Sequence, residues 1–247
     1  MFGSFTGSFK FGRRKKYVAP AANSWTGTTS GLVFNLLNAP SSGTTWSDAT
    51  GNGYNATLNG SPTYVATNNG GIKLNNADYT GTDYISVPYN IGINTITVEV
   101  VASFNPTSQW ATIWGNDSYT AQRGMLAFMN SSTNITWGRP SATNAATITT
   151  SNSIRQWIFV MNNGSLSLYL NGTQVGTTAS RTTGLYATGN FYFGARHTND
   201  GTGATDKMNS SVSANLPVFY QMRLYNKALS GAEITANYDA VKTTYGI

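Results

Sequence analysis

The sequence of 247 residues contains no cysteine and a single histidine, His197. Without cysteine the chain has no disulfide bonds, thiolate metal sites or cysteine nucleophile. One histidine also excludes a histidine-rich metal cluster. Charged residues amount to only 10% of the chain, against roughly 25% in typical soluble domains. Uncharged Thr, Asn, Ser and Gly must therefore supply most of the polar surface.

Long apolar runs are missing as well. No stretch approaches the ~18 residues that a membrane-spanning helix needs, so we expect no membrane segment. The opening segment Met1–Phe5 also lacks the charged and apolar regions of a secretory signal. We therefore expect synthesis in the cytoplasm without a signal peptide.

The net charge of +6 comes almost wholly from one short segment. Five of the fifteen basic residues lie within positions 10–16, and the first acidic residue is Asp48. Without residues 1–16, ten basic residues face nine acidic ones, a net charge of +1. A nucleic-acid groove needs Lys and Arg spread over a domain face, so we expect no nucleic-acid binding by the main domain.

Residues 1–24 are predicted to form an extended arm and linker. Four phenylalanines alternate with small residues ahead of the basic run. Such a segment cannot build a core alone, yet it is too aromatic for an ordinary disordered tail. We expect it to dock on another protein; the alternatives are docking on its own domain, nucleic-acid binding and a floppy basic tail. The predicted anchoring residues are Phe2, Phe5, Phe9, Phe11, Arg13, Arg14, Lys15 and Lys16.

From Trp25 onward the pattern is one of short strands separated by turns. Residues 32–37 and 95–104 are rich in β-formers. Residues 156–175 contain two Asn-Gly pairs between alternating apolar runs, which predicts a three-stranded antiparallel meander. Helix signals are confined to the C-terminal end, where Ser230-Gly231-Ala232-Glu233 has the spacing of a capping box.

The predicted helix places Ile234, Tyr238 and Val241 on one face, packed against the sandwich edge. Many short strands and one late helix predict an all-β protein. We expect residues 25–247 to form a single two-sheet antiparallel β-sandwich with one short C-terminal helix.

Three segments carry a family resemblance. Residues 47–60 (SDATGNGYNATLNG) are similar to D-x-S-G-N-G-x-x-G-x-L-x-G, residues 168–172 (LYLNG) to LYVNG, and residues 222–238 to VRIYNRALSxxEIxxNY. In this order the motifs resemble those of laminin G-like, concanavalin A-like domains. The resemblance implies a jelly roll of two antiparallel sheets with about six or seven strands each.

The resemblance also implies a candidate metal ligand. In many relatives an acid at the position of Asp48 binds calcium, helped by a carboxylate in the strand before the last motif. Tyr220 and Gln221 stand at that second position, whereas calcium prefers several carboxylates among six to eight oxygen ligands. The alternative is that Asp48 organises a glycine-rich turn through local hydrogen bonds.

The carboxylate inventory argues against an enzyme. Glycoside hydrolases, which share this fold, need two carboxylates beside the scissile bond. The only glutamates are Glu99, which has no acid two or three positions away, and Glu233 in the capping box. His197 lies in a polar segment after a strand and has no evident triad partners. We expect no catalytic activity.

Binding by loops is the remaining expectation for the sandwich. Two loop regions combine aromatic rings, amides and charged groups of the kind that bind sugars, although ordinary loop chemistry is the alternative. The candidate ligand-binding residues are Trp114, Asn116, Asp117, Tyr119, Arg196, His197 and Asp200.

Two functions remain open. The start GSFTGSFKFGRRKK resembles openings of bacteriophage structural proteins, which implies a decoration protein, fibre or tail appendage on the virion surface. Its arm would bind capsid, tail or baseplate proteins, in many copies per particle. The alternative is a carbohydrate-binding module or adhesin that recognises host surface glycans. The two hypotheses differ in whether the arm or the sandwich carries the function.

Overall fold

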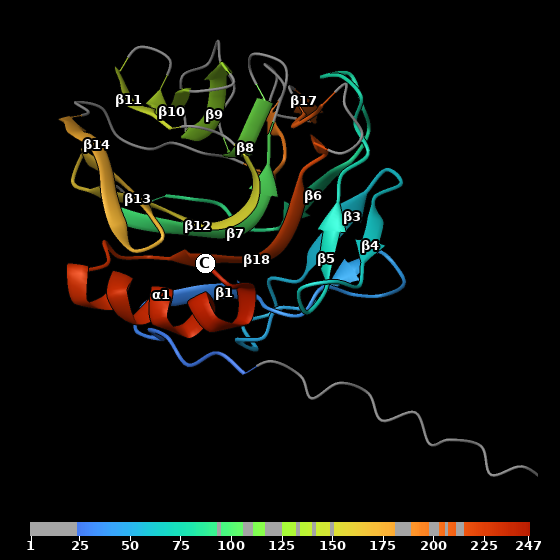
Figure 1. Cartoon of the computed structure of the whole chain (residues 1–247), viewed down its shortest axis with the longest axis horizontal. Helices are drawn as coiled ribbons and strands as arrows, with labels where there is room; N and C mark the ends of the chain where they lie inside the picture. The colour runs from blue at the N-terminus through green and yellow to red at the C-terminus, as the bar shows by residue number, and fades with distance from the viewer. Residues whose placement is uncertain are drawn as a thin grey trace, which may run out of the picture.

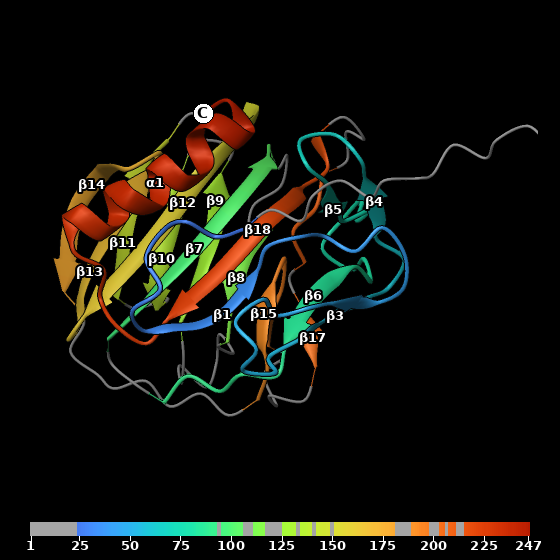
Figure 2. The same ribbon diagram turned by 90° about the horizontal axis from the view of Figure 1, so that it is seen from below.

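The computed structural model describes residues 24–92, 95–105, 111–116, 125–131, 134–139, 142–148, 151–180, 189–197, 203–205, 207–210 and 215–247. These residues contain two eight-stranded antiparallel sheets, a two-stranded ribbon and one α-helix. Figures 1 and 2 show the sheets stacked face to face, with the helix against the outer face of one of them. The predicted β-sandwich with a C-terminal helix is confirmed.

The first sheet, sheet A, carries the helix. Its strands are β1 (Leu32–Leu36), β4 (Thr63–Val65), β5 (Gly71–Lys73), β7 (Thr95–Phe104), β12 (Ser151–Asn162), β13 (Ser165–Leu170), β14 (Thr173–Ser180) and β18 (Val218–Tyr225). They lie in the order β14-β13-β12-β7-β18-β5-β4. Strand β1 pairs with the C-terminal part of β18, on the edge whose other part pairs with β5.

The second sheet, sheet B, lies opposite. Its strands are β2 (Thr45–Trp46), β3 (Ala56–Asn59), β6 (Tyr84–Val87), β8 (Ala111–Gly115), β9 (Leu126–Ser131), β10 (Asn134–Arg139), β11 (Ala142–Thr147) and β15 (Phe191–Phe193). They lie in the order β11-β10-β9-β8-β15-β6-β3-β2. A separate ribbon pairs β16 (Arg196–His197) with β17 (Ala204–Thr205). Each sheet exceeds the expected six or seven strands because short strands such as β2 and β4 extend the edges.

An aromatic core fills the space between the sheets. Phe34, Trp114, Phe159 and Phe191 are fully buried. The Trp114 ring stacks on the Phe191 ring, with 5.5 Å between their centroids. It meets the Phe159 ring edge to face, with 5.4 Å between their centroids. Rings in these arrangements add to the stabilisation from burial alone.

The predicted meander is present as β12, β13 and β14. Its turns lie at Asn163-Gly164 (φ 46° and 90°) and Asn171-Gly172 (φ 48° and 76°). Positive φ at both central residues matches the right-handed twist of the strands, which is why Asn-Gly suits these turns.

The helix, α1 (Gly231–Tyr245), begins at the predicted capping box. Ser230 Oγ accepts from the Glu233 amide at 3.4 Å, and Glu233 Oε2 accepts from the Ser230 amide at 2.9 Å. Ile234 and Val241 are buried as expected, but Tyr238 is only half-buried, and Asn237 is buried instead. No helix in the described part of the chain is long and apolar enough to span a membrane.

Candidate functional site

A cluster of polar side chains lies on the outer face of sheet A, beneath α1. Its members, which we call the Glu99 cluster, are Glu99, Gln156, Gln221, Arg223, Tyr225 and Asn237, all at most 3% exposed. Glu99 on β7 and Arg223 on β18 are cross-strand partners, so their side chains emerge on the same face. Arg223 NH1 donates to Glu99 Oε1 at 2.9 Å.

Glu99 has further donors from two other elements. Gln156 Nε2 on β12 donates to Oε1 at 2.9 Å, and Asn237 Nδ2 on α1 donates to Oε2 at 2.8 Å. A buried carboxylate requires such partners because its desolvation is costly. Burial, together with the charge of Glu99, also raises the pKa of Tyr225 far above its usual range. Glu99 is therefore a structural carboxylate with no exposed surface for a substrate to reach.

The residues that precede β1 close over this cluster. Residues 24–31, the N-terminal strap, cross the outer face of sheet A beside α1 (Figure 2). The guanidinium carbon of Arg223 lies 3.4 Å from the ring centroid of Trp25, in a cation–π contact. The Thr28 amide donates to Asn237 Oδ1 at 2.8 Å, and Trp25 Nε1 donates to the Thr28 carbonyl at 2.9 Å. The strap is thus held on the sheet by the same polar groups that connect the strands to α1.

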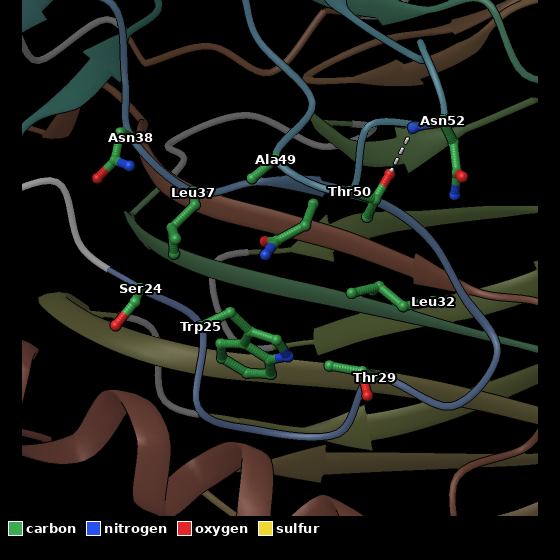
Figure 3. Close-up of a pocket in the computed structure, with 10 residues that line it drawn as sticks. Ser24, Trp25, Thr29, Leu32, Leu37, Asn38, Ala49, Thr50 and Asn52 are labelled. Carbon is green, nitrogen blue, oxygen red and sulfur yellow. Dashed lines mark hydrogen bonds between the residues drawn. The ribbon is translucent and has the colours of Figure 1, made fainter.

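A hollow of about 710 Å³, the strap pocket, lies between the strap, β1 and the turn that follows β2. Figure 3 shows Trp25 and Thr29 on one side and Ala49 and Thr50 on the other. Among the residues that the structure describes, its lining carries no charged side chain. The lining residues are Ser24, Trp25, Thr29, Leu32, Asn35, Leu37, Asn38, Ala49, Thr50 and Asn52.

Asn35 stands out in this lining. It is only 2% exposed, and it pairs across β1 and β18 with Arg223, so its side chain shares the outer face with the Glu99 cluster. Its Oδ1 is buried without a hydrogen-bond partner among the described residues. An unsatisfied buried acceptor costs about 1–3 kcal/mol. Asn35 is itself one of the residues that line the strap pocket.

Asp48 holds the turn that carries Ala49, Thr50 and Asn52, the lining residues opposite the strap. Its Oδ1 accepts from the amides of Asn35 at 2.9 Å and Thr50 at 3.0 Å. Its Oδ2 accepts from Thr50 Oγ1 at 2.7 Å and the Tyr54 amide at 3.3 Å. These four contacts match the expected role of Asp48 in organising a glycine-rich turn, where Gly51 and Gly53 have φ of 81° and 86°.

These contacts do not fit a calcium ion, because each of these four hydrogen bonds brings a donor group to the Asp48 carboxylate. Tyr220 and Gln221 stand where relatives have the second calcium-binding carboxylate. The ring of Tyr220 packs against that of Tyr245, with 5.6 Å between their centroids, and Gln221 Oε1 accepts a hydrogen bond from Arg223. The described residues hold no group of three or more His, Cys, Asp or Glu side chains that could bind a metal ion. Calcium binding at Asp48 stays a prediction.

The prediction that Trp114 belongs to a ligand-binding loop was wrong. Trp114 lies on β8, is 0% exposed and points into the aromatic core. The adjacent Asn116 is also buried: its Oδ1 accepts from the Met125 amide at 2.9 Å, and its own amide donates to the Met125 carbonyl. The signal was misleading because a strand buried on both faces shows no alternation.

The other predicted loop residues are only partly described. Arg196 is half-buried on β16, and the His197 backbone pairs with Ala204 on β17. Asp117, Tyr119 and Asp200 lie outside the described residues, as does the predicted anchoring arm (Phe2, Phe5, Phe9, Phe11, Arg13, Arg14, Lys15 and Lys16). Among the described candidates, Arg196 lies next to Gly115, which stands between Trp114 and Asn116 in the sequence.

Sequence reasoning missed the residues of the strap pocket. One signal was available: Asn35 is the only polar residue in the apolar run Leu32–Leu37. A lone amide in a strand that is otherwise core-forming needs a partner or a ligand. The contribution of Trp25 had no local signal, because it depends on Arg223, which is far away in the sequence.

Solved structures with the same fold include several binding domains. The binding domain of Paraclostridial Mosquitocidal Protein 1 is 16% identical, with a TM-score of 0.62 over 87% of this chain and 55% of that one. A second similar structure is that of a botulinum neurotoxin type C whose cell entry depends on interaction with two ganglioside molecules. It is 13% identical, with a TM-score of 0.63 over 85% of this chain and 51% of that one. This chain thus spans about half the length of these toxin chains.

A third similar structure matches over nearly its full length. Domain 4 of an extracellular arabinanase from Geobacillus stearothermophilus, in complex with arabinotriose, is 16% identical, with a TM-score of 0.57 over 83% of this chain and 97% of that one. At such identities these likenesses show the fold alone. A search among curated protein sequences finds no match.

The family is shown by a sequence model. The model of the concanavalin A-like lectin/glucanases superfamily matches residues 79–235, which is more than half of the chain. It includes the meander and the final strand with the start of α1, two of the three segments that carried the resemblance. The chain therefore belongs to the concanavalin A-like lectin/glucanases superfamily.

Proposed function

We propose that this protein is a non-enzymatic glycan-binding domain whose strap pocket holds a neutral carbohydrate. The observation that carries the proposal is the unpartnered Oδ1 of Asn35 beside a pocket without described charges. A sugar hydroxyl can donate to that oxygen, and the Trp25 ring offers an apolar surface for a sugar ring. A small set of polar groups within an otherwise uncharged hollow is the usual composition of a small-molecule site.

The similar structures support a carbohydrate ligand without identifying it. One of them is a botulinum neurotoxin type C whose cell entry depends on two ganglioside molecules, and another is an arabinanase domain in complex with arabinotriose. The described glutamates support a binding role over catalysis: Glu99 is buried in its cluster, and Glu233 serves the helix cap and an ion pair with Lys227 at 2.7 Å. Glycoside hydrolysis needs two carboxylates at one bond.

A glycan array followed by calorimetric titration tests this proposal. We expect binding of at least one neutral glycan, and a loss of at least about tenfold in affinity for Asn35→Leu, since the substitution removes the acceptor. Asn162→Leu is the matched control, because Asn162 is exposed on β12, three strands away from β1. Absence of any glycan binding, or equal affinity of Asn35→Leu and the wild type, would contradict the proposal.

We also propose, from the arm, that the domain is displayed on a phage particle. The supporting observation is that four phenylalanines and five basic residues occur within the first 16 positions. The phenylalanines would fill pockets on a capsid, tail or baseplate protein, and the cations would face acidic surface. Many copies on a virion would make weak glycan contacts by each sandwich effective together.

Particles that lack this protein provide the test. We expect the full chain to decorate them, and a chain that starts at Ser24 to fail. A full-length variant with Phe2, Phe5, Phe9 and Phe11 changed to Ser separates the role of the rings from that of the charges. If the shortened chain decorates particles as well as the full chain, the arm is not the anchor.

A further inference from the structure

A second hollow adjoins the strap pocket around the end of β1. This tyrosine pocket has a volume of about 360 Å³ and is lined by Leu32, Val33, Asn52, Tyr54, Tyr89 and Asn226. It shares Leu32 and Asn52 with the strap pocket. Both volumes lie within the range of about 300–1,000 Å³ that is typical of small-molecule sites.

The tyrosine pocket offers a pair of aromatic rings. Tyr54 and Tyr89 are half-buried and meet edge to face, with 5.1 Å between their ring centroids. Tyr89 also contacts the core ring of Phe34 at 6.4 Å, which anchors the pair to the sandwich. These rings give the second hollow the same kind of apolar surface that Trp25 gives the first.

Asn52 forms the boundary between the two hollows, and it is held in place. Its Nδ2 donates to the Val33 carbonyl at 2.8 Å, and its amide donates to Thr50 Oγ1 at 3.1 Å (Figure 3). Thr50 is in turn held by Asp48. The boundary is therefore a pre-formed part of the Asp48 turn, and a ligand can contact it from either side without rearranging the backbone.

We infer that the strap pocket and the tyrosine pocket are adjoining subsites for one glycan chain. The inference rests on the proposed function and deepens it: the ligand is an oligosaccharide of at least two sugar units, and a single sugar fills only one subsite. Each subsite has an aromatic surface, and Asn52 and Leu32 contact the ligand where the two meet.

The test measures affinity against chain length. The probes are ladders of neutral gluco-, galacto- and arabino-oligosaccharides of one to four units, titrated calorimetrically into the full chain. We expect at least a tenfold gain in affinity from the monosaccharide to the di- or trisaccharide, followed by a plateau. Tyr54→Ala should remove that gain, because it removes one of the two rings of the tyrosine pocket. Tyr79→Ala is the matched control, because Tyr79 is 60% exposed and lines neither pocket.

The outcomes separate this inference from the proposed function. Equal affinity for the monosaccharide and the trisaccharide overturns the two-subsite inference but leaves glycan binding standing. A gain with length that survives in Tyr54→Ala also overturns it. Binding of no probe overturns both proposals.

Should Tyr54→Ala fail to fold, Asn226→Ala serves instead, because Asn226 lines the tyrosine pocket and its side chain is exposed. A reduced gain in affinity with oligosaccharide length in Asn226→Ala supports the inference, and an undiminished gain overturns it.

Discussion

Two buried asparagines flank the Glu99–Arg223 pair on the outer face of sheet A, and they differ in their partners. Asn237, which is 0% exposed, donates to Glu99 Oε2 and the Tyr225 hydroxyl and accepts from the Thr28 amide. Asn35, which is 2% exposed, has no hydrogen-bond partner for its Oδ1 among the residues that the structure describes. The two residues are of the same type and are almost equally buried. The difference in hydrogen bonding separates a group that stabilises the fold from one that is available to a ligand.

The contrast extends to the surroundings of each residue. The Glu99 cluster connects β7, β12, β18 and α1 through charge-assisted hydrogen bonds, which are stronger than neutral ones. The strap joins it through the Thr28–Asn237 hydrogen bond and the Trp25–Arg223 contact. Within the described part of the chain, Gln156 Oε1 and Arg223 Nε are the buried atoms of this cluster that lack a partner. The strap pocket has a hollow next to its unpaired group, whereas the cluster is covered by Trp25 and α1.

The largest effect is expected when the centre of the cluster is removed. Glu99→Leu should lower the free energy of unfolding by about 3–5 kcal/mol, because it leaves Arg223 buried without its counterion. Chemical denaturation measures this change. The double variant Glu99→Leu/Arg223→Met is the control, since it removes both charges and should recover much of the loss. A loss below about 1 kcal/mol in the single variant would show that the ion pair is not structural.

A smaller loss is expected at the satisfied asparagine. Asn237→Leu removes three hydrogen bonds and leaves the Thr28 amide, Glu99 Oε2 and the Tyr225 hydroxyl without these partners. We expect a loss of about 2–3 kcal/mol in denaturation experiments. The strap should also become easier to cleave by protease. If strap cleavage stays as slow as in the wild type, Asn237 does not hold the strap.

Alkaline pH provides a further probe of the helix side of the cluster. Burial raises the pKa of Tyr245 to about 12, against about 10 in an unfolded chain. Because the pKa of Tyr245 is raised in the folded state, its contribution to the free energy of unfolding is complete below pH 10 and is lost as the pH rises toward 12. Denaturation at a series of pH values should show this fall. Tyr245→Phe should lose less stability over this pH range. If its stability falls with pH as steeply as that of the wild type, the fall comes from other groups such as Tyr225.

The smallest effect on stability is expected at the unpaired asparagine. Asn35→Leu should change the free energy of unfolding by less than about 0.5 kcal/mol, or raise it, because it removes an unsatisfied acceptor. Thermal and chemical denaturation of this variant beside Asn237→Leu compare the two asparagines directly. A loss as large as that of Asn237→Leu would mean that Asn35 is structural and would end the distinction between them.

Local features of the fold were predictable because their signals lie within a few residues. The two Asn-Gly turns need positive φ, and the capping box needs only Ser230 and Glu233. Both are confirmed. The prediction for Trp114 was wrong because aromatic loops and buried strands have similar composition. Asp48 could be given its turn role from its glycine-rich context, whereas its link to the Asn35 amide required the structure.

The sequence by itself determined the family, the sandwich with its late helix, and the near-neutral charge of the body. It also indicated that Glu99 lacks a nearby acid. Only the tertiary structure decided what Glu99 does, because Arg223 and Asn237 are 124 and 138 positions away. The same holds for the strap pocket, which joins residues 24–52 from three segments of chain. Hydrogen-bond satisfaction and burial depend on contacts between distant segments, and a sequence pattern records only neighbours along the chain.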